Sequence, residues 1–196
     1  RAASPASAVS SAWYPPNAAP STWREWLLDR LIDEPTSPVN GWRKMIADAP
    51  PLDALFTATS ARIQELLEAC PERRDLVHGD LLHHNVLLAD DLSDVSAVFS
   101  WKCSALGDFL FDTAWCTFWK SWYPGMAAID VWSDTVTAPD LTASDLVDAA
   151  VRHHCYELQI GAGHLGWHLW ANEAEGLAYV VRRLEEVLER GPLTTV

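Results

Sequence analysis

The sequence predicts a mainly α-helical fold with one small β-hairpin. Apolar residues recur at the spacing of amphipathic helices over most of the chain, and the period shortens to β-like runs only within residues 76–101. Hydrophobic residues make up 49% of the 196 residues and charged residues 21%, which is enough for a globular core. No apolar run approaches the about 18 residues of a membrane span.

The first half of the chain predicts three helices. Thr22 and Glu25 have the spacing of a capping box, in which the threonine is the N-cap and the glutamate the third helical residue. This helix is expected to end near Ile32, before the helix-breaking "EPTSP". Two more helices are expected, over residues 41–48 and 52–70.

The second half predicts a hairpin followed by helices. Residues 86–88 and 95–99 are short β-like runs around the turn "ADDLSD". Helices are expected over 143–160 and 172–190. An earlier helix carries three tryptophans at i, i+4 and i+7, namely Trp115, Trp119 and Trp122. This stripe is interpreted as core, with an aromatic wall for a ligand ring as the alternative.

Charge and cysteine usage restrict the classes of partner and compartment. The net charge of −13 disfavours nucleic acid and anionic membranes and favours cationic small molecules or metal ions, although a solvated acidic surface has the same composition. The four cysteines form no CxxC pair, which indicates free thiols in a reducing cytoplasm. The Ala/Ser/Pro-rich residues 1–20 are interpreted as a linker or a truncated remnant.

One group of polar residues, the polar constellation, is a candidate catalytic site. His78-Gly79-Asp80 is followed by Asn85 five residues after the aspartate, and Ser100 ends the next apolar run. This spacing suits phosphoryl transfer, because an aspartate can accept the proton of an attacking hydroxyl while an asparagine oxygen ligates Mg²⁺. The hairpin would return a second metal ligand at position 100, where an acid is expected and a serine stands.

The run "LVHGDLLHHNVLL…AVFSW…ALGDFLFDTAW", together with "STWREWL" and "CPERRDLVHGD", resembles the aminoglycoside phosphotransferase family, and within it the hygromycin B phosphotransferases. The likeness covers about residues 20–125 well and the remainder loosely. It implies a protein-kinase-like fold, of which residues 21–196 form the C-terminal lobe with the catalytic loop and the acceptor site. It also implies ATP and Mg²⁺ as cofactors and a small-molecule acceptor such as a cationic aminoglycoside.

The resemblance assigns roles by position. Asp80 matches the catalytic aspartate, and His78 matches the residue that packs and orients its loop. Asn85 matches the magnesium ligand, while Ser100 occupies the place of a second metal-binding aspartate. The resemblance also implies structural acids at Asp108 and Asp112 and positions on the acceptor side at His83 and His84. Trp119, from the tryptophan stripe, and Glu157, from the acids of the later helices, are further candidate acceptor contacts. For Glu157, plain surface exposure is favoured over an acceptor contact.

Two departures from the family favour other interpretations. Ser100 carries no charge for a hard dication, so activity is expected to fall roughly a thousandfold or more. A Gly-rich loop is missing, and no lysine precedes Lys44, so this chain alone is expected to be inactive.

A degenerate, non-catalytic small-molecule binding module is therefore the second hypothesis. A metallohydrolase using His83, His84 and Asp80 is the third, although "HGDLLHH" has the wrong order for common zinc sites. Turn-capping by Asp80 and Asn85 is the structural alternative.

Overall fold

The computed structural model describes residues 21–194, so the expected linker over residues 1–20 lies outside the described residues. The helices are α2 (Trp23–Asp29), α3 (Trp42–Ala47), α4 (Pro50–Leu66), α5 (Leu110–Trp119), α6 (Val131–Val136), α7 (Ala149–Trp170) and α8 (Ala174–Arg190). The strands are β1 (Asp75–Val77), β2 (Val86–Leu88), β3 (Val95–Val98) and β4 (Ala105–Gly107). Among the described residues, no helix is long and apolar enough to cross a membrane.

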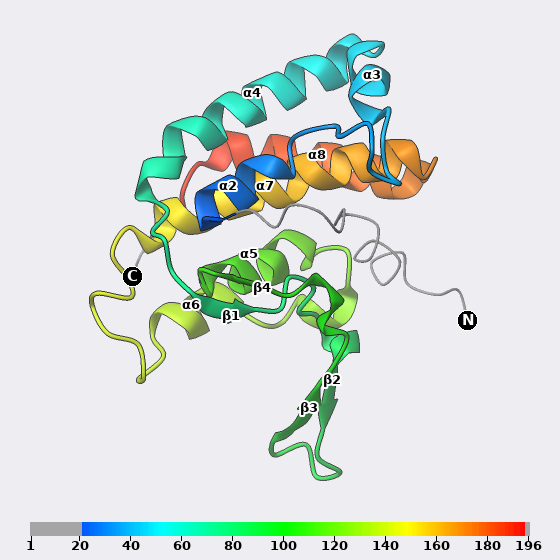
Figure 1. Cartoon of the computed structure of the whole chain (residues 1–196). Coiled ribbons are helices and arrows are strands. Elements are labelled where there is room, and N and C mark those ends of the chain that lie inside the picture. The colour runs from blue at the N-terminus through cyan, green and yellow to red at the C-terminus, as the bar shows by residue number, and fades with distance from the viewer. Residues whose placement is uncertain (1–20, 195–196) are drawn as a thin grey trace.

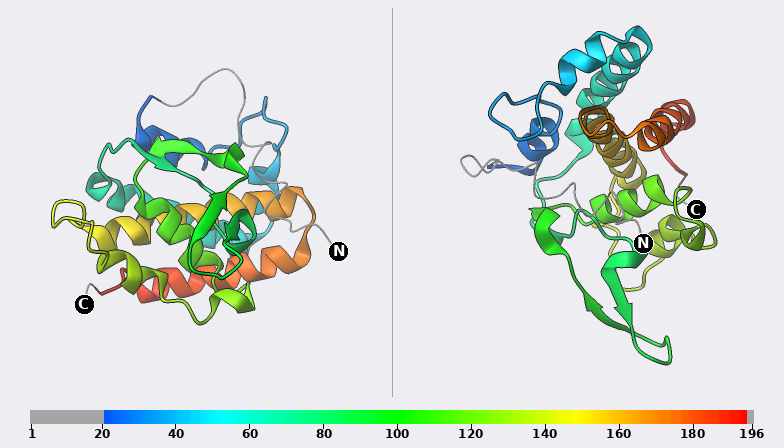
Figure 2. Two further views of the ribbon diagram at one scale, coloured as in Figure 1. Left: turned by 90° about the horizontal axis from the view of Figure 1, so that it is seen from below. Right: turned by 90° about the vertical axis from the view of Figure 1, so that its right-hand side faces the viewer.

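The helices α2, α3, α4, α7 and α8 gather on one side of a smaller region built from α5, α6 and the strands (Figure 1). The hairpin β2–β3 projects from this region, away from the helices (Figure 2). The expected mainly helical fold with a small hairpin is therefore confirmed.

Helix α7 is the centre of the core. It packs against α3, α4, α5 and α8, and residues 152–168 are all buried. Gly161 makes this packing possible, because a Cβ there would lie 2.4 Å from Leu184 of α8 and 2.9 Å from Phe118 of α5. A helix enclosed on every side has no single apolar stripe, which explains why periodicity describes it poorly.

The predicted helix boundaries are right at some ends and wrong at others. The capping box is present, since the Thr22 hydroxyl accepts from the Glu25 N–H and the Glu25 carboxylate accepts from the Thr22 N–H. The helix expected over 143–160 instead begins at Ala149 and continues to Trp170. Its start is delayed because the preceding loop is held by hydrogen bonds from the Arg152 side chain to backbone carbonyls.

The strands form two antiparallel pairs. The hairpin was expected, and its register pairs Val86 with Val98. The second pair was not expected: β1 pairs with β4, with Leu76 opposite Leu106. Strands of three residues are too short to show a period of two. This pair nevertheless brings the segment before residue 78 beside the segment after residue 104, and thus closes the loop that carries the polar constellation.

Candidate active site

Asp80 and Asn85 meet in the loop that follows β1. Strand β1 ends at Val77, and a 3₁₀ turn over His83–Asn85 returns the chain. The Asn85 side-chain Nδ2 donates to Asp80 Oδ2 at 3.0 Å and to the Asp80 backbone carbonyl at 2.7 Å. The two side chains that the sequence spaced five residues apart are therefore held together, with the asparagine oxygen left for another partner.

The second carboxylate oxygen of Asp80 is free. Asp80 is 1% exposed, and its Oδ1 has no hydrogen-bond partner among the described residues. Burial raises the pKa of Asp80 to about 7, and the nearby charge of Asp112 acts in the same direction. The Asn85 amide and the Trp115 indole lower this pKa, although the indole N–H lies outside hydrogen-bonding geometry. A carboxyl that titrates near neutrality can accept a proton from a substrate.

Asp112 fixes the backbone of the loop. Its carboxylate accepts the His78 N–H at 2.7 Å and the Gly79 N–H at 2.8 Å. Burial raises the pKa of Asp112, and these two backbone hydrogen bonds oppose the rise. Because Asp112 belongs to α5, the loop of residues 78–85 is attached directly to the helical core.

His78 packs inside the loop rather than facing a substrate. Its Nδ1 accepts the Asp80 N–H at 3.2 Å, which places the ring proton on Nε2, and Nε2–H donates to the Phe99 carbonyl at 2.9 Å. The Phe99 N–H in turn donates to the Asn85 carbonyl at 3.1 Å. Residue 99 is thus joined to both ends of the loop, and Ser100 follows it directly in the chain.

Gly79 is required by the shape of the turn. Its φ is +72°, and a Cβ at this position would lie 2.7 Å from the Cys103 carbonyl oxygen. Any other residue would combine an unfavourable left-handed backbone with a backbone clash.

Ser100 is half-buried, adopts a left-handed backbone with φ of +71°, and begins the turn Trp101–Cys103. The donors that the sequence predicts around Asp80 are one carboxylate, the Asn85 amide oxygen and this hydroxyl. Among residues 21–194, no group of three or more His, Cys, Asp or Glu side chains is arranged to hold a metal ion. Hard dications bind oxygen-rich, carboxylate-containing sites, so this set does not fit a tight Mg²⁺ site.

His83 and His84 form an aromatic cluster with Tyr123. The ring centroids of His83 and His84 lie 5.0 and 5.7 Å from that of Tyr123. His83 is exposed, while both ring nitrogens of His84 are buried without a hydrogen-bond partner. Burial lowers the pKa of His84, and the charges of His83 and His78 add to this. A neutral imidazole with free nitrogen atoms therefore stands beside the loop. Tyr123 follows α5 in an irregular segment and was not predicted.

Trp119 and Glu157 lie in the core. Trp119 is 6% exposed and stacks on Tyr179 with ring centroids 5.4 Å apart, as the core interpretation of the tryptophan stripe expects. Glu157 is fully buried and forms ion pairs with Arg183 at 3.1 Å and with Arg190. Surface exposure was the favoured interpretation of Glu157, and this is wrong. Within residues 21–194, its hydrogen bonds and ion pairs are with Thr117, His153, Arg183 and Arg190 and not with the loop.

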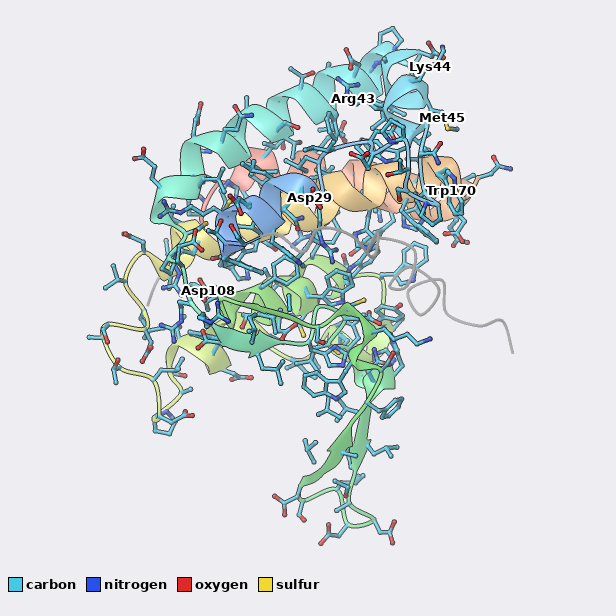
Figure 3. The ribbon with its side chains drawn as sticks, viewed as in Figure 1. Asp29, Arg43, Lys44, Met45, Asp108 and Trp170 are labelled. Carbon is cyan, nitrogen blue, oxygen red and sulfur yellow. The ribbon has the colours of Figure 1, made fainter. Side chains whose placement is uncertain are left out.

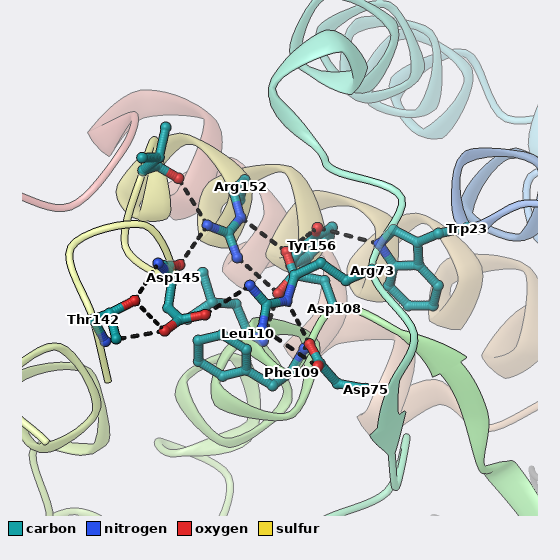
Figure 4. Close-up of polar contacts among 11 residues, drawn as sticks. Trp23, Arg73, Asp75, Asp108, Phe109, Leu110, Thr142, Asp145, Arg152 and Tyr156 are labelled. Carbon is teal, nitrogen blue, oxygen red and sulfur yellow. Dashed lines mark hydrogen bonds and ion pairs between the residues drawn. The ribbon is translucent and has the colours of Figure 1, made fainter. Parts of the chain in front are cut away.

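Asp108 joins the two parts of the fold (Figure 3). Its buried carboxylate accepts two hydrogen bonds from Arg152, both at 2.8 Å, and one from the Tyr156 hydroxyl at 2.7 Å (Figure 4). Tyr156 accepts in turn from the Trp23 indole at 3.2 Å. Arg152 and Tyr156 were not among the predicted site residues, because helical periodicity does not indicate which distant acid a residue will contact.

Comparisons with known proteins give the family and the fold of the chain. The phosphotransferase enzyme family matches residues 11–143. A hygromycin-B 4-O-kinase of Escherichia coli is 26% identical over 174 residues, which are 87% of this chain and 46% of that protein. Among solved structures, a thermostable mutant of aminoglycoside phosphotransferase APH(4)-Ia in a ternary complex with AMP-PNP and hygromycin B is 24% identical, with a TM-score of 0.68. This alignment covers 86% of this chain and 52% of that one.

The apo form of a thermostable APH(4)-Ia mutant gives a TM-score of 0.69 at 24% identity, covering 87% of this chain and 53% of that one. The chain thus spans about half the length of the relatives it matches. The solved structures support the fold, and the family match covers well over half of the chain. The resemblance recognised in the sequence is confirmed: the chain belongs to the phosphotransferase enzyme family.

Proposed function

We propose that residues 21–196 are the catalytic-loop and acceptor-binding lobe of a phosphotransferase that moves the γ-phosphoryl group of ATP to a hydroxyl of an aminoglycoside-type acceptor. Family membership supports the reaction class. The name of the Escherichia coli relative and the hygromycin B complex of the solved relative support the acceptor class. Four free, buried cysteines are compatible with the cytoplasmic location that we also propose.

The observation that carries the proposal is the Asp80–Asn85 pair. Asn85 occupies Oδ2 of Asp80, and Oδ1 is buried without a partner in the part of the chain that the structure describes. An acceptor hydroxyl placed within hydrogen-bond reach of Oδ1 would donate its proton there. As the hydroxyl oxygen forms its bond to phosphorus, the bond from that phosphorus to the leaving oxygen of ADP breaks, and the proton passes to Asp80. The raised pKa of Asp80, about 7, suits this transfer.

The loop residues position this base. Asp112 holds the backbone at His78 and Gly79, and the His78 ring holds the Asp80 N–H. In this family Mg²⁺ would supply charge neutralisation on the transferred phosphate. Since the donor set around Ser100 does not fit a tight magnesium site, no step here is assigned to the metal.

A second candidate function is a non-catalytic module that binds the same acceptor. Ser100 favours this candidate, because the hydroxyl brings no negative charge where a metal-binding acid is expected. The two candidates share acceptor binding and differ in phosphoryl transfer. A phosphorylated acceptor formed by the protein with Mg·ATP, and not by an Asp80→Asn variant, would exclude the binding module.

Acceptor binding is tested by a ligand-observed NMR titration with hygromycin B at low and high salt. We expect weak binding that salt reduces, because screening shortens the attraction of a −13 chain to about 8–10 Å. Asp80→Asn should weaken binding severalfold. Asp90→Asn makes the same charge change in the exposed hairpin turn and should leave it unchanged. Absence of binding by hygromycin B and other aminoglycosides at millimolar concentration would refute the proposed acceptor class.

A further inference from the structure

A groove lies between α5 and α6, next to the catalytic loop but separate from the Asp80 carboxylate. Its volume is about 540 Å³. Its apolar lining includes Leu81, Phe109, Ile129 and Leu141. Ile129 is 44% exposed. Pockets of about 300–1,000 Å³ with mostly apolar walls are the size that takes small organic ligands.

The groove has three carboxylates in its lining. Asp112, Asp134 and Asp140 line it, and no lysine, arginine or histidine among residues 21–194 does. Asp112 is already engaged by the loop backbone. Asp134 and Asp140 are exposed, and neither side chain makes a hydrogen bond or ion pair with any residue in the described range 21–194. Two carboxylates without a partner among these residues therefore lie beside the apolar lining of the groove.

This groove and the Asp80 site meet α5 at neighbouring residues. The Asp80 carboxylate is close to Trp115, whose ring packs on His164 of α7 with centroids 5.2 Å apart. The next residue, Cys116, lines the groove, and its thiol donates to the Leu81 carbonyl at 3.0 Å. Among the described residues that line the groove are Leu81 and Asp112 but not Asp80, so a ligand there would contact the loop at Leu81.

We propose that this groove binds a small organic cation with an apolar body, independently of the phosphoryl acceptor. The apolar walls would cover the body of the ligand, and Asp134 and Asp140 would face its positive charge. The volume of the groove is that of a small molecule, and the lining carries only negative formal charge. This charge complementarity selects a cation over a neutral or anionic ligand.

Benzyltrimethylammonium is a suitable probe, with benzenesulfonate as its anionic counterpart. We expect ¹H–¹⁵N NMR shifts at α6 and residues 138–141 with a millimolar dissociation constant for the cation, and none for the sulfonate. The double variant Asp134→Asn/Asp140→Asn should bind the cation roughly threefold to tenfold more weakly, as expected for two exposed charge pairs. Glu185→Gln removes an exposed charge on α8 and should change the affinity less than twofold.

A second variant tests the groove itself. Ala138→Trp should fill the space and abolish binding while the circular dichroism spectrum and melting temperature stay near those of the parent. The proposal would be overturned by shifts that map elsewhere, by equal binding of benzenesulfonate, or by unchanged affinity in the double aspartate variant. Self-association through the groove, seen by sedimentation, would also overturn it. Asp80→Asn should retain groove binding, so a failed acceptor site and a failed groove are separable outcomes.

Discussion

The guanidinium of Arg152 on α7 and the carboxylate of Asp108 before α5 form a buried ion pair with two hydrogen bonds of 2.8 Å each. Arg152 and Asp108 side chains are 2% and 0% exposed. The same guanidinium also donates to the carbonyls of Asp145 and Val147. One side chain therefore joins the central helix, the start of α5 and the loop that precedes α7.

Arg152→Met is expected to destabilise the fold by about 3–5 kcal/mol, because it leaves the Asp108 carboxylate buried without its ion-pair partner. Arg152→Lys keeps the charge but not the two-bond geometry, so we expect an intermediate loss. Urea unfolding followed by tryptophan fluorescence gives these values. Arg182→Met is the control, since Arg182 pairs with Glu186 at 3.9 Å on the exposed surface and should cost less than about 1 kcal/mol. Similar losses for Arg152→Met and Arg182→Met would contradict the buried pair.

Gly79→Ala is expected to destabilise more than Gly41→Ala. Both glycines have positive φ, +72° and +82°, so both substitutions carry backbone strain of about 1 kcal/mol. Only Gly79 has an obstacle, because the Cys103 carbonyl oxygen would lie 2.7 Å from the added methyl group, whereas Gly41 has nothing within 4 Å. Melting temperatures of the two variants check this. Equal shifts would mean that the loop moves away from residue 103 at little cost.

Acid is expected to weaken the fold through its buried histidines. Burial lowers the pKa of His153 to about 4, with the charges of Arg190 and Arg183 adding to the effect and Glu157 opposing it. The unfolded chain binds this proton as pH falls through about 6.5, while the folded chain does not until about 4. The free energy of unfolding should therefore fall on acidification, by about 2 kcal/mol from this residue between pH 7 and 5.

The test compares unfolding free energies at pH 7 and pH 5 for the parent and His153→Gln. The unfolding free energy of the variant should fall less between the two pH values, whatever its value at pH 7. His83→Gln removes an exposed ring and should follow the parent. A His153→Gln profile parallel to that of the parent would show that His153 does not contribute to the pH dependence.

Ser100→Asp is expected to raise the affinity of the Asp80–Asn85 site for divalent metal, because a carboxylate would add a second anionic ligand. Mn²⁺ titrations of parent and variant, read by paramagnetic relaxation of solvent water, measure the change. Ser96→Asp adds the same charge on the exposed strand β3 and should have no effect. Equal affinities for the parent and Ser100→Asp would mean that position 100 does not face the metal.

Local features were predictable from the sequence and long-range ones were not. The Thr22–Glu25 capping box and the β2–β3 hairpin depend on residues close in sequence, and both are present. The β1–β4 pair joins segments about thirty residues apart by three-residue strands, which are too short for a periodic signal.

Among the buried polar contacts, too, the sequence predicted only the one between residues close in the chain. The loop spacing placed Asp80 and Asn85 together, because five residues of a tight turn restrict where they lie. Glu157 was placed at a surface because glutamate is seldom fully buried without partners. Its partners, Arg183 and Arg190, come from the next helix, and only the packing of α7 on α8 brings them into contact.

We propose above that Oδ1 of Asp80 receives the acceptor hydroxyl. A titration with hygromycin B at pH 7 that follows the ¹³Cγ resonance of Asp80, assigned by its loss in Asp80→Asn, tests this directly. We expect this resonance to shift with the same dissociation constant as the ligand signals, while the resonance of exposed Asp90 stays in place. Saturation of the ligand signals with an unmoved Asp80 resonance would contradict it.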